Sequence, residues 1–176
     1  MKLCMFSPRD HDLERGWPGR IDGERVIQLA AQTLQSFFTG GGQAREHAEY
    51  PLADVVFRAP VLHPPSVRIF DDSGDFVFAN PAAIKAAGED PGVAAAEPVE
   101  RVAAIIGADG AIGGFSPFVE WVAPQLHGAK QRDFALTLGP VVTTPDEGSP
   151  PGVDWQLLVV RAAENTRLYP GDLIVR

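Results

Sequence analysis

The chain has 176 residues, of which 45% are hydrophobic, 22% charged and 9% aromatic. This composition is typical of a folded domain and excludes a disordered chain. Fifteen Lys and Arg residues against 23 Asp and Glu residues give a formal net charge of −8, which disfavours the polyphosphate backbone of nucleic acids as a partner. No apolar run approaches the roughly 20 residues that a membrane-spanning helix needs. Neither nucleic acid nor a membrane is therefore expected as a partner.

The single cysteine, Cys4, excludes an internal disulfide and a cysteine-based zinc site. It lies in an apolar segment, which predicts a small buried hydrophobe rather than a nucleophile. The first residues of the chain contain no apolar segment before their charges, so no signal peptide is expected. Together these features predict a cytoplasmic protein.

The 18 Gly and 16 Pro residues leave little room for long helices and predict short strands joined by turns. In the first part of the chain, strands are expected at residues 2–6 and 55–59, and a hairpin at residues 19–29 around the Asp-Gly turn. Apolar residues at helical spacing predict a helix within residues 30–38, and residues 43–50 are interpreted as a second short helix.

Two consecutive prolines, Pro64 and Pro65, predict a boundary between a small domain of residues 1–63 and a core of residues 64–176. Within the core, strands are expected at residues 76–78, 99–106 and 168–175. Residues 112–122 are interpreted as a strand, or a strand followed by a helix, and residues 155–161 form another apolar segment. The expected fold class is mostly β with minor α.

Seven segments, in this order, resemble the fumarylacetoacetate hydrolase family. The hairpin of residues 19–29 resembles the strand pair of that family's small amino-terminal domain, and residues 57–61 with Pro64-Pro65-Ser66 resemble the connection to its core. The later matching segments are residues 78–83, 99–110, 119–123, 130–140 and 168–174.

The resemblance implies a mixed β-roll with a small amino-terminal α/β domain, usually assembled as a dimer. It also implies a Mg²⁺, Ca²⁺ or Mn²⁺ ion held by two glutamates and an aspartate. Such a hard cation chelates a keto acid and stabilises the enolate that develops during carbon–carbon hydrolysis, decarboxylation or isomerisation.

The resemblance places Val99 and Arg101 where the family has its two metal-binding glutamates, and Glu120 where it has the aspartate. An apolar side chain and a cation do not replace two anionic ligands. Glu97 has the same strand parity as the lost ligands, whereas Glu100 faces the other side unless the strand contains a bulge. The resemblance also implies a lid helix with a histidine–glutamate dyad, and the segment between Ser66 and Phe76 is too short for it.

These departures predict a shortened, divergent relative with no metal cofactor. The alternative is a Mg²⁺ or Mn²⁺ site that uses Glu120 with Glu97 or Glu100. The candidate catalytic residues are Glu120, Lys130 and His127. The candidate substrate-binding residues are Arg101, Trp121 and Asn80.

The expected function is the binding of a small carbonyl or carboxylate compound, with any catalysis resting on metal-independent acid–base, cyclisation or dehydration chemistry. One alternative is a divalent-metal-dependent hydrolase or decarboxylase of diketo or oxo acids. Another is a non-catalytic subunit that supports a partner enzyme. A homodimer is expected, because an association of two copies would cover an exposed sheet edge.

Overall fold

The computed structural model describes residues 1–176 and is mostly β, as the sequence predicts. It contains thirteen strands, two α-helices and several single turns of 3₁₀ helix. The strands are β1 (Lys2–Pro8), β2 (Trp17–Asp22), β3 (Arg25–Leu29), β4 (Glu46–Pro51), β5 (Val55–Arg58), β6 (Val67–Phe70), β7 (Phe76–Ala79), β8 (Ile84–Ala86), β9 (Glu97–Ile106), β10 (Ile112–Val122), β11 (Leu136–Leu138), β12 (Val141–Thr143) and β13 (Leu173–Val175). The helices are α1 (Leu34–Thr39) and α2 (Trp155–Ala163).

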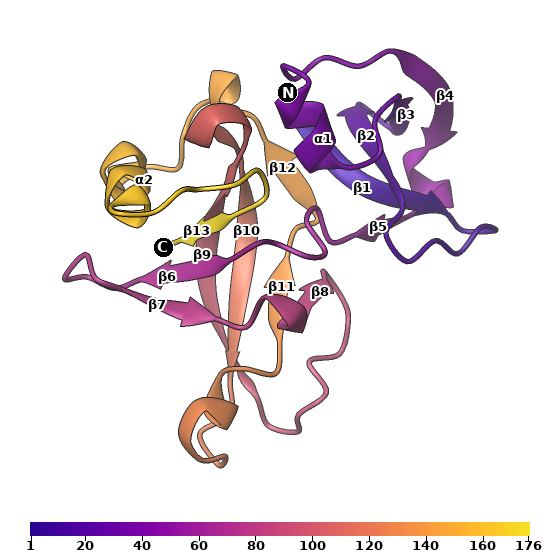
Figure 1. Ribbon diagram of the computed structural model, residues 1–176. Coiled ribbons are helices and arrows are strands. Elements are labelled where there is room, and N and C mark those ends of the chain that lie inside the picture. Colours follow the sequence, from indigo (N-terminus) through magenta and orange to yellow (C-terminus); the bar gives the residue numbers. More distant parts are fainter.

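All strands belong to one strongly branched sheet with the main order β4-β3-β2-β1-β12-β10-β9-β13-β6-β7. Most pairs are antiparallel, and the parallel pairs are β13 with β6 and β8 with β11. The two longest strands, β9 and β10, form the central hairpin, with the amino-terminal strands on one side and α2 on the other (Figure 1). The mixed sheet agrees with the expected β-roll.

The amino-terminal part confirms the predicted hairpin and corrects the predicted helices. Asp22 pairs with Arg25 across a tight turn in which Gly23 has a φ of +58°, a conformation that glycine adopts without a steric cost. The helix begins only at Leu34, because Thr33 and Ser36 form a capping box in which each side-chain oxygen accepts a hydrogen bond of 3.0 Å from the other residue's backbone N–H.

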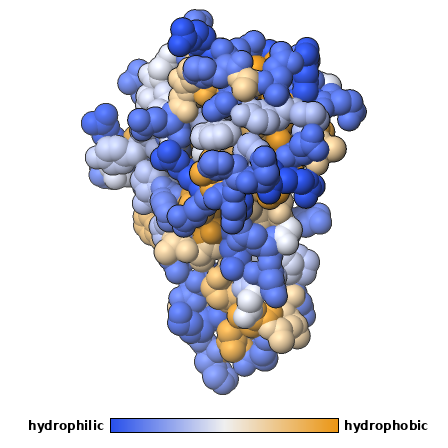
Figure 2. Space-filling model, turned by 90° about the vertical axis from the view of Figure 1, so that its right-hand side faces the viewer, coloured by the Kyte–Doolittle hydropathy of each residue, from blue (hydrophilic) through white to orange (hydrophobic).

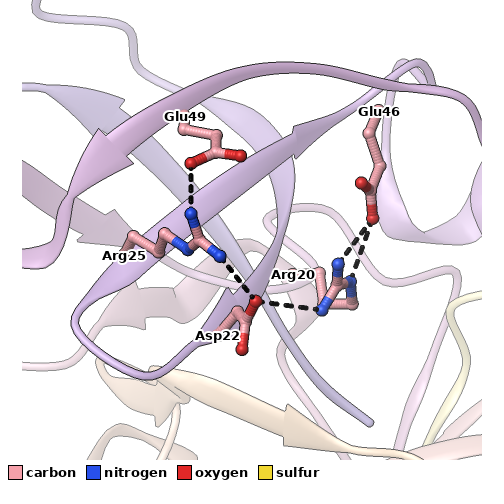
Figure 3. A network of polar contacts seen from close by, with 5 residues as sticks. All are labelled: Arg20, Asp22, Arg25, Glu46 and Glu49. Atoms are coloured by element: carbon pink, nitrogen blue, oxygen red, sulfur yellow. Dashed lines mark hydrogen bonds and ion pairs between the residues drawn. The ribbon is translucent and has the colours of Figure 1, made fainter.

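Residues 43–50 do not form the predicted helix. Most of this segment forms strand β4, which pairs with β3 and is almost entirely exposed. Ion pairs hold β4 to the hairpin: Arg20 contacts Glu46 at 2.6 Å, and Arg25 contacts Glu49 at 2.6 Å (Figure 3). Asp22 lies between the two arginines. These charged side chains lie at the edge of the sheet, where they disfavour pairing with a strand of another molecule.

The interior is divided by the central hairpin into two main apolar clusters. The larger contains 21 buried residues, from Leu3 and Met5 in β1 to Ala103 and Ile105 in β9. The smaller contains 10 buried residues and packs α2 against the other face of the hairpin. Residues 155–161, an apolar segment in the sequence, thus lie in a helix that begins after Asp154, whose side chain accepts a hydrogen bond from the Leu157 N–H.

The surface is mainly hydrophilic, with smaller hydrophobic areas, one of them in the narrower lower part of the molecule (Figure 2). None of the helices is long and apolar enough to cross a membrane.

Candidate functional site

The register of β9 against β10 determines which candidate side chains share a face. Val99 pairs with Glu120, and Arg101 pairs with Phe118. Because paired residues and every second residue along a strand point the same way, Glu120, Val99 and Arg101 lie on one face. The pairing is regular from Glu97 to Ile105, since the only register shift lies near Gly114. No bulge therefore turns Glu100 toward Glu120.

Glu120 is the centre of a charged cluster. Its side chain is 2% exposed, and both of its carboxylate oxygens accept hydrogen bonds from arginines. Arg101 contacts Oε2 through Nε and Nη2, both at 3.1 Å, and Arg132 contacts Oε1 through Nη1 at 3.0 Å. The two cations satisfy a carboxylate whose burial would otherwise be unfavourable. We call Arg101, Glu120 and Arg132 the arginine–glutamate cluster.

The two arginines of the cluster are more exposed than Glu120. The side chain of Arg101 is 20% exposed and that of Arg132 is 56% exposed. Arg101 also lines a cavity of about 380 Å³, together with Ser116, Thr143 and Ser149 among other residues. Neither Glu120 nor Arg132 lines this cavity. The cluster thus consists of a buried carboxylate, one guanidinium group that borders the cavity and one that is exposed to solvent.

Asn80 and Lys130 both contact Asp133, the residue after Arg132. The Asn80 Nδ2 group donates to the Asp133 carbonyl at 3.1 Å, and Lys130 Nζ lies 3.0 Å from Asp133 Oδ2. Asn80 also caps a turn, since its Oδ1 accepts from the Ala82 N–H at 3.0 Å. These two candidate residues are therefore connected to the cluster through the chain segment that carries Arg132.

Trp121 and His127 are not part of the cluster. Trp121 follows Glu120 on β10 and so faces the opposite side of the sheet, where its indole N–H donates to Thr137 Oγ1 at 3.0 Å. His127 is exposed and precedes the 3₁₀ turn Gly128–Gln131 without a side-chain capping bond. The structure therefore brings Glu120 and Arg101 into contact, whereas no hydrogen bond or ion pair joins Trp121 or His127 to them.

Arg132 is the cluster residue that is absent from the sequence-based candidates. It lies in the segment of residues 130–140 that resembles the family, but no spacing rule links it to Glu120. The contact depends on the path of the chain between β10 and β11, which returns through the turn Gly128–Gln131. The sequence carries no signal that would have identified Arg132 as a partner of Glu120.

A second buried polar group involves the proline-glycine-aspartate segment near the end of the chain. Asp172, 1% exposed, accepts from Ser66 Oγ at 2.6 Å and from the Tyr169 N–H at 2.7 Å. Arg68 donates to Ser66 and lies over the rings of Phe76 and Phe78. These contacts join β6, β7 and the loop before β13, which is a structural role.

Cys4 is fully buried, and its burial raises the pKa of the thiol to about 12. A thiol with this pKa is protonated at neutral pH and is a poor nucleophile. The expectation of a buried cysteine is confirmed.

The carboxylates around the cluster do not form a metal-binding group in this structure. No three His, Cys, Asp or Glu side chains lie close enough together to hold a metal ion. Both oxygens of Glu120 are bound by guanidinium groups, which repel a divalent cation. In this conformation the residues present do not fit the three-carboxylate site that the family resemblance implies.

Comparison with known proteins gives matches among solved structures only. No family model matches the chain, and no curated protein sequence matches it. Maleylpyruvate hydrolase from Sphingobium sp. SYK-6 superposes with a TM-score of 0.76 at 19% identity, over 99% of this chain and 87% of that chain. 2-Hydroxyhepta-2,4-diene-1,7-dioate isomerase from Mycobacterium marinum superposes with a TM-score of 0.69 at 18% identity, over 99% of this chain and 86% of that chain.

Two of the similar structures contain metals and small ligands. Maleylpyruvate hydrolase in complex with manganese(II) and pyruvate superposes with a TM-score of 0.75 at 18% identity, over 99% of this chain and 87% of that chain. 2-Keto-3-deoxy-D-arabinonate dehydratase complexed with magnesium and 2,5-dioxopentanoate superposes with a TM-score of 0.73 at 14% identity, over 99% of this chain and 86% of that chain.

These two complexes overturn the sequence-based expectation of no cofactor, because they associate proteins of this fold with a divalent metal. The expectation relied on the loss of two ligand positions on β9, and a strand position by itself does not exclude a metal held elsewhere. The architecture itself agrees with the resemblance over nearly the whole chain. The chain has the fold of the fumarylacetoacetate hydrolase family.

Proposed function

We propose that this protein binds a small carbonyl-containing carboxylate, such as a 2-oxo acid, next to the arginine–glutamate cluster. The observation that carries the proposal is the pairing of Arg101 and Arg132 with the buried Glu120 on the central hairpin. Guanidinium groups are well suited to carboxylates, which they bind through parallel hydrogen bonds. The complexes of similar structures with pyruvate and with 2,5-dioxopentanoate support this ligand class.

Lys130 and His127 are the proposed acid–base groups. Both are exposed, and both lie at the turn that leads into Arg132. A lysine or histidine near a bound carbonyl can exchange a proton at the adjacent carbon or at the carbonyl oxygen. Glu120 has a different position, because both of its oxygens already accept hydrogen bonds from cations. We therefore propose that it orients the arginines rather than transferring a proton.

A second candidate function is the divalent-metal-dependent conversion of a diketo or oxo acid. The manganese(II) and magnesium complexes of similar structures favour it. In this candidate, the metal would supply a cation that binds the oxo-acid oxygens and stabilises developing negative charge. The residues around Glu120 do not fit such an ion, because arginines bind both of its carboxylate oxygens.

Calorimetric titration of the purified chain with pyruvate tests the proposal. The titration is run without added metal, with Mg²⁺ and with Mn²⁺, and L-lactate serves as the matched control because it retains the carboxylate and lacks the carbonyl. We expect saturable binding of pyruvate and weaker binding of lactate. An absence of pyruvate binding under all three conditions contradicts the proposal. Binding only with metal supports the second candidate, which is then tested by following turnover of oxaloacetate or an acylpyruvate.

We also propose that the chain forms a homodimer through β7. This strand ends the sheet order, and its side chains Val77 and Phe78 are 61% and 68% exposed. Exposed apolar side chains on an uncovered edge favour association. Light scattering coupled to size exclusion is expected to give a dimer for the wild type and a monomer for Phe78→Lys. Leu157→Lys, at a 47% exposed position on α2, is the control and should remain dimeric. A monomeric wild type would refute this assembly.

A further inference from the structure

We infer that Arg101 and Arg132 together bind the carboxylate of the ligand, and that Glu120 positions them for this task. The inference rests on the proposed function and extends it by assigning the carboxylate contact to specific residues. Arg132 is the new binding residue, and Glu120 is a positioning residue that acts through the two arginines.

Both arginines have donors that the protein does not use. Arg101 binds Glu120 through Nε and Nη2, so its Nη1 is free of protein partners. Arg132 binds Glu120 through Nη1 alone, so its Nε and Nη2 are free. Each guanidinium has five N–H groups, and only part of this capacity is used by Glu120. The unused groups lie on side chains that are 20% and 56% exposed.

The charge of the cluster also favours an anion. Two guanidinium groups and one carboxylate leave one net positive charge, in a chain whose formal net charge is −8. An additional carboxylate would bring the cluster to neutrality. Because Glu120 is buried, the attraction between its carboxylate and the arginines is less screened than in bulk water, and this attraction holds the two guanidinium groups next to each other.

The segment that carries Arg132 is fixed on both sides. The Arg132 N–H donates to the Ala129 carbonyl at 3.0 Å, and the preceding carbonyl of Gln131 accepts from the Ala123 N–H at 2.8 Å. On the other side, Asn80 holds the carbonyl of Asp133. Arg132 is therefore held at Glu120 before a ligand arrives, which reduces the entropy lost when a ligand orders the side chain.

The test is the affinity for pyruvate of three variants, measured in the metal condition in which the wild type binds. Arg132→Gln removes the exposed guanidinium, and Arg132→Lys keeps the positive charge without the planar donor pair. Arg15→Gln is the matched control, because Arg15 is exposed on the loop before β2 and the change in net charge is the same. We expect Arg132→Gln to weaken binding roughly tenfold or more, Arg132→Lys to weaken it less, and Arg15→Gln to leave it within about twofold.

Arg101→Gln is expected to weaken binding to a similar degree, provided that thermal unfolding shows it to be folded. If it does not fold, the two Arg132 variants decide the matter, since that side chain is largely exposed. Equal pyruvate affinity in the wild type and Arg132→Gln would overturn the inference while leaving the proposed function intact. Failure of the wild type to bind pyruvate would instead refute the proposed function, and the inference with it.

Discussion

At the scale of single residues, the arginine–glutamate cluster has an uneven distribution of burial. Glu120 is almost completely buried, Arg101 is mostly buried and Arg132 is more than half exposed. The cost of removing a member depends on what is left behind in the low-dielectric interior. A buried carboxylate that loses its buried partner lowers the free energy of unfolding strongly. A cation that loses its partner lowers it little when water can solvate the cation.

This asymmetry predicts the order of stability losses for three substitutions. Arg101→Met should cost about 3 kcal/mol, because it leaves the buried Glu120 with only an exposed partner. Glu120→Gln should cost about 1–2 kcal/mol, since the remaining cations are partly hydrated. Arg132→Met should cost about 1 kcal/mol or less, as for other exposed ion pairs.

Urea unfolding of the three variants measures these losses. The double variant Arg101→Met with Glu120→Met serves as a control, because it removes the buried charge together with its partner and should lose less than Arg101→Met alone. An Arg132→Met variant that loses as much as Arg101→Met would show that burial does not determine the order.

The sequence predicted part of this cluster. Arg101 and Glu120 came from the family resemblance, and strand parity correctly placed Arg101 on the same face of β9 as Val99. That Glu120 shares this face depends on the register between β9 and β10, which the sequence did not predict. Trp121 was selected from the same segment, although the alternation of a strand places it opposite Glu120. Arg132 was missed, because its contact depends on a long-range chain path that no local pattern encodes.

At the scale of elements, local signals predicted the β2–β3 hairpin and the apolar strands β1, β5, β7 and β9, but not the polar strand β4. The turn chemistry of Asp22-Gly23 specified the β2–β3 pair from two residues. Strand β4 has no comparable signal, because its residues are mostly polar and exposed. It is a strand because its backbone pairs with β3. Helix α2 was missed for a related reason, since a short apolar segment fits a buried strand or a helix equally well.

The β6–β7 hairpin is closed by Asp71, which gives it a pH-dependent contribution to stability. The Asp71 carboxylate accepts hydrogen bonds from Ser73 Oγ at 2.6 Å and from the Ser73 N–H at 2.9 Å. These bonds, the Ser73 hydroxyl first, lower the pKa of Asp71 below its ordinary value of 3.8. The unfolded chain therefore binds this proton more readily than the folded chain does.

From this sign, the stabilisation by Asp71 is complete above about pH 5, where the unfolded chain has also lost this proton, and it is lost as the pH falls through the lowered folded-state pKa. The variant Asp71→Asn retains an acceptor oxygen and lacks the titrating group. The free energy of unfolding of the wild type relative to this variant should be constant above about pH 5 and decrease toward about pH 2.

Thermal unfolding at a series of pH values gives this difference. Asp75→Asn, in the same loop and also exposed, is the control. The pH dependence of its free energy of unfolding should be closer to that of the wild type. A wild type and an Asp71→Asn variant with parallel pH profiles would contradict the assignment.

At the scale of the whole molecule, the proposed division into residues 1–63 and 64–176 crosses a shared interior. Strand β1 pairs with β12, with Leu3 opposite Val142. The larger apolar cluster contains Leu3, Leu34 and Phe37 from the first part and Ala103 and Ile105 from the second. The two parts are distinct in topology, but neither encloses this cluster alone.

We therefore predict that the chain unfolds in a single cooperative transition. The calorimetric and van't Hoff enthalpies should agree, as they do when no intermediate is populated.

Leu3→Ala, at a position with no exposed surface, should destabilise the whole chain by about 2–5 kcal/mol. Native-state hydrogen exchange followed by mass spectrometry should show protection falling together in peptides from both parts. Leu157→Ala, on the exposed side of α2, should change neither part by more than about 1 kcal/mol. If Leu3→Ala reduced protection only in residues 1–63, the two parts would be energetically independent, and the shared cluster would not couple the amino-terminal strands to the hairpin that carries Glu120.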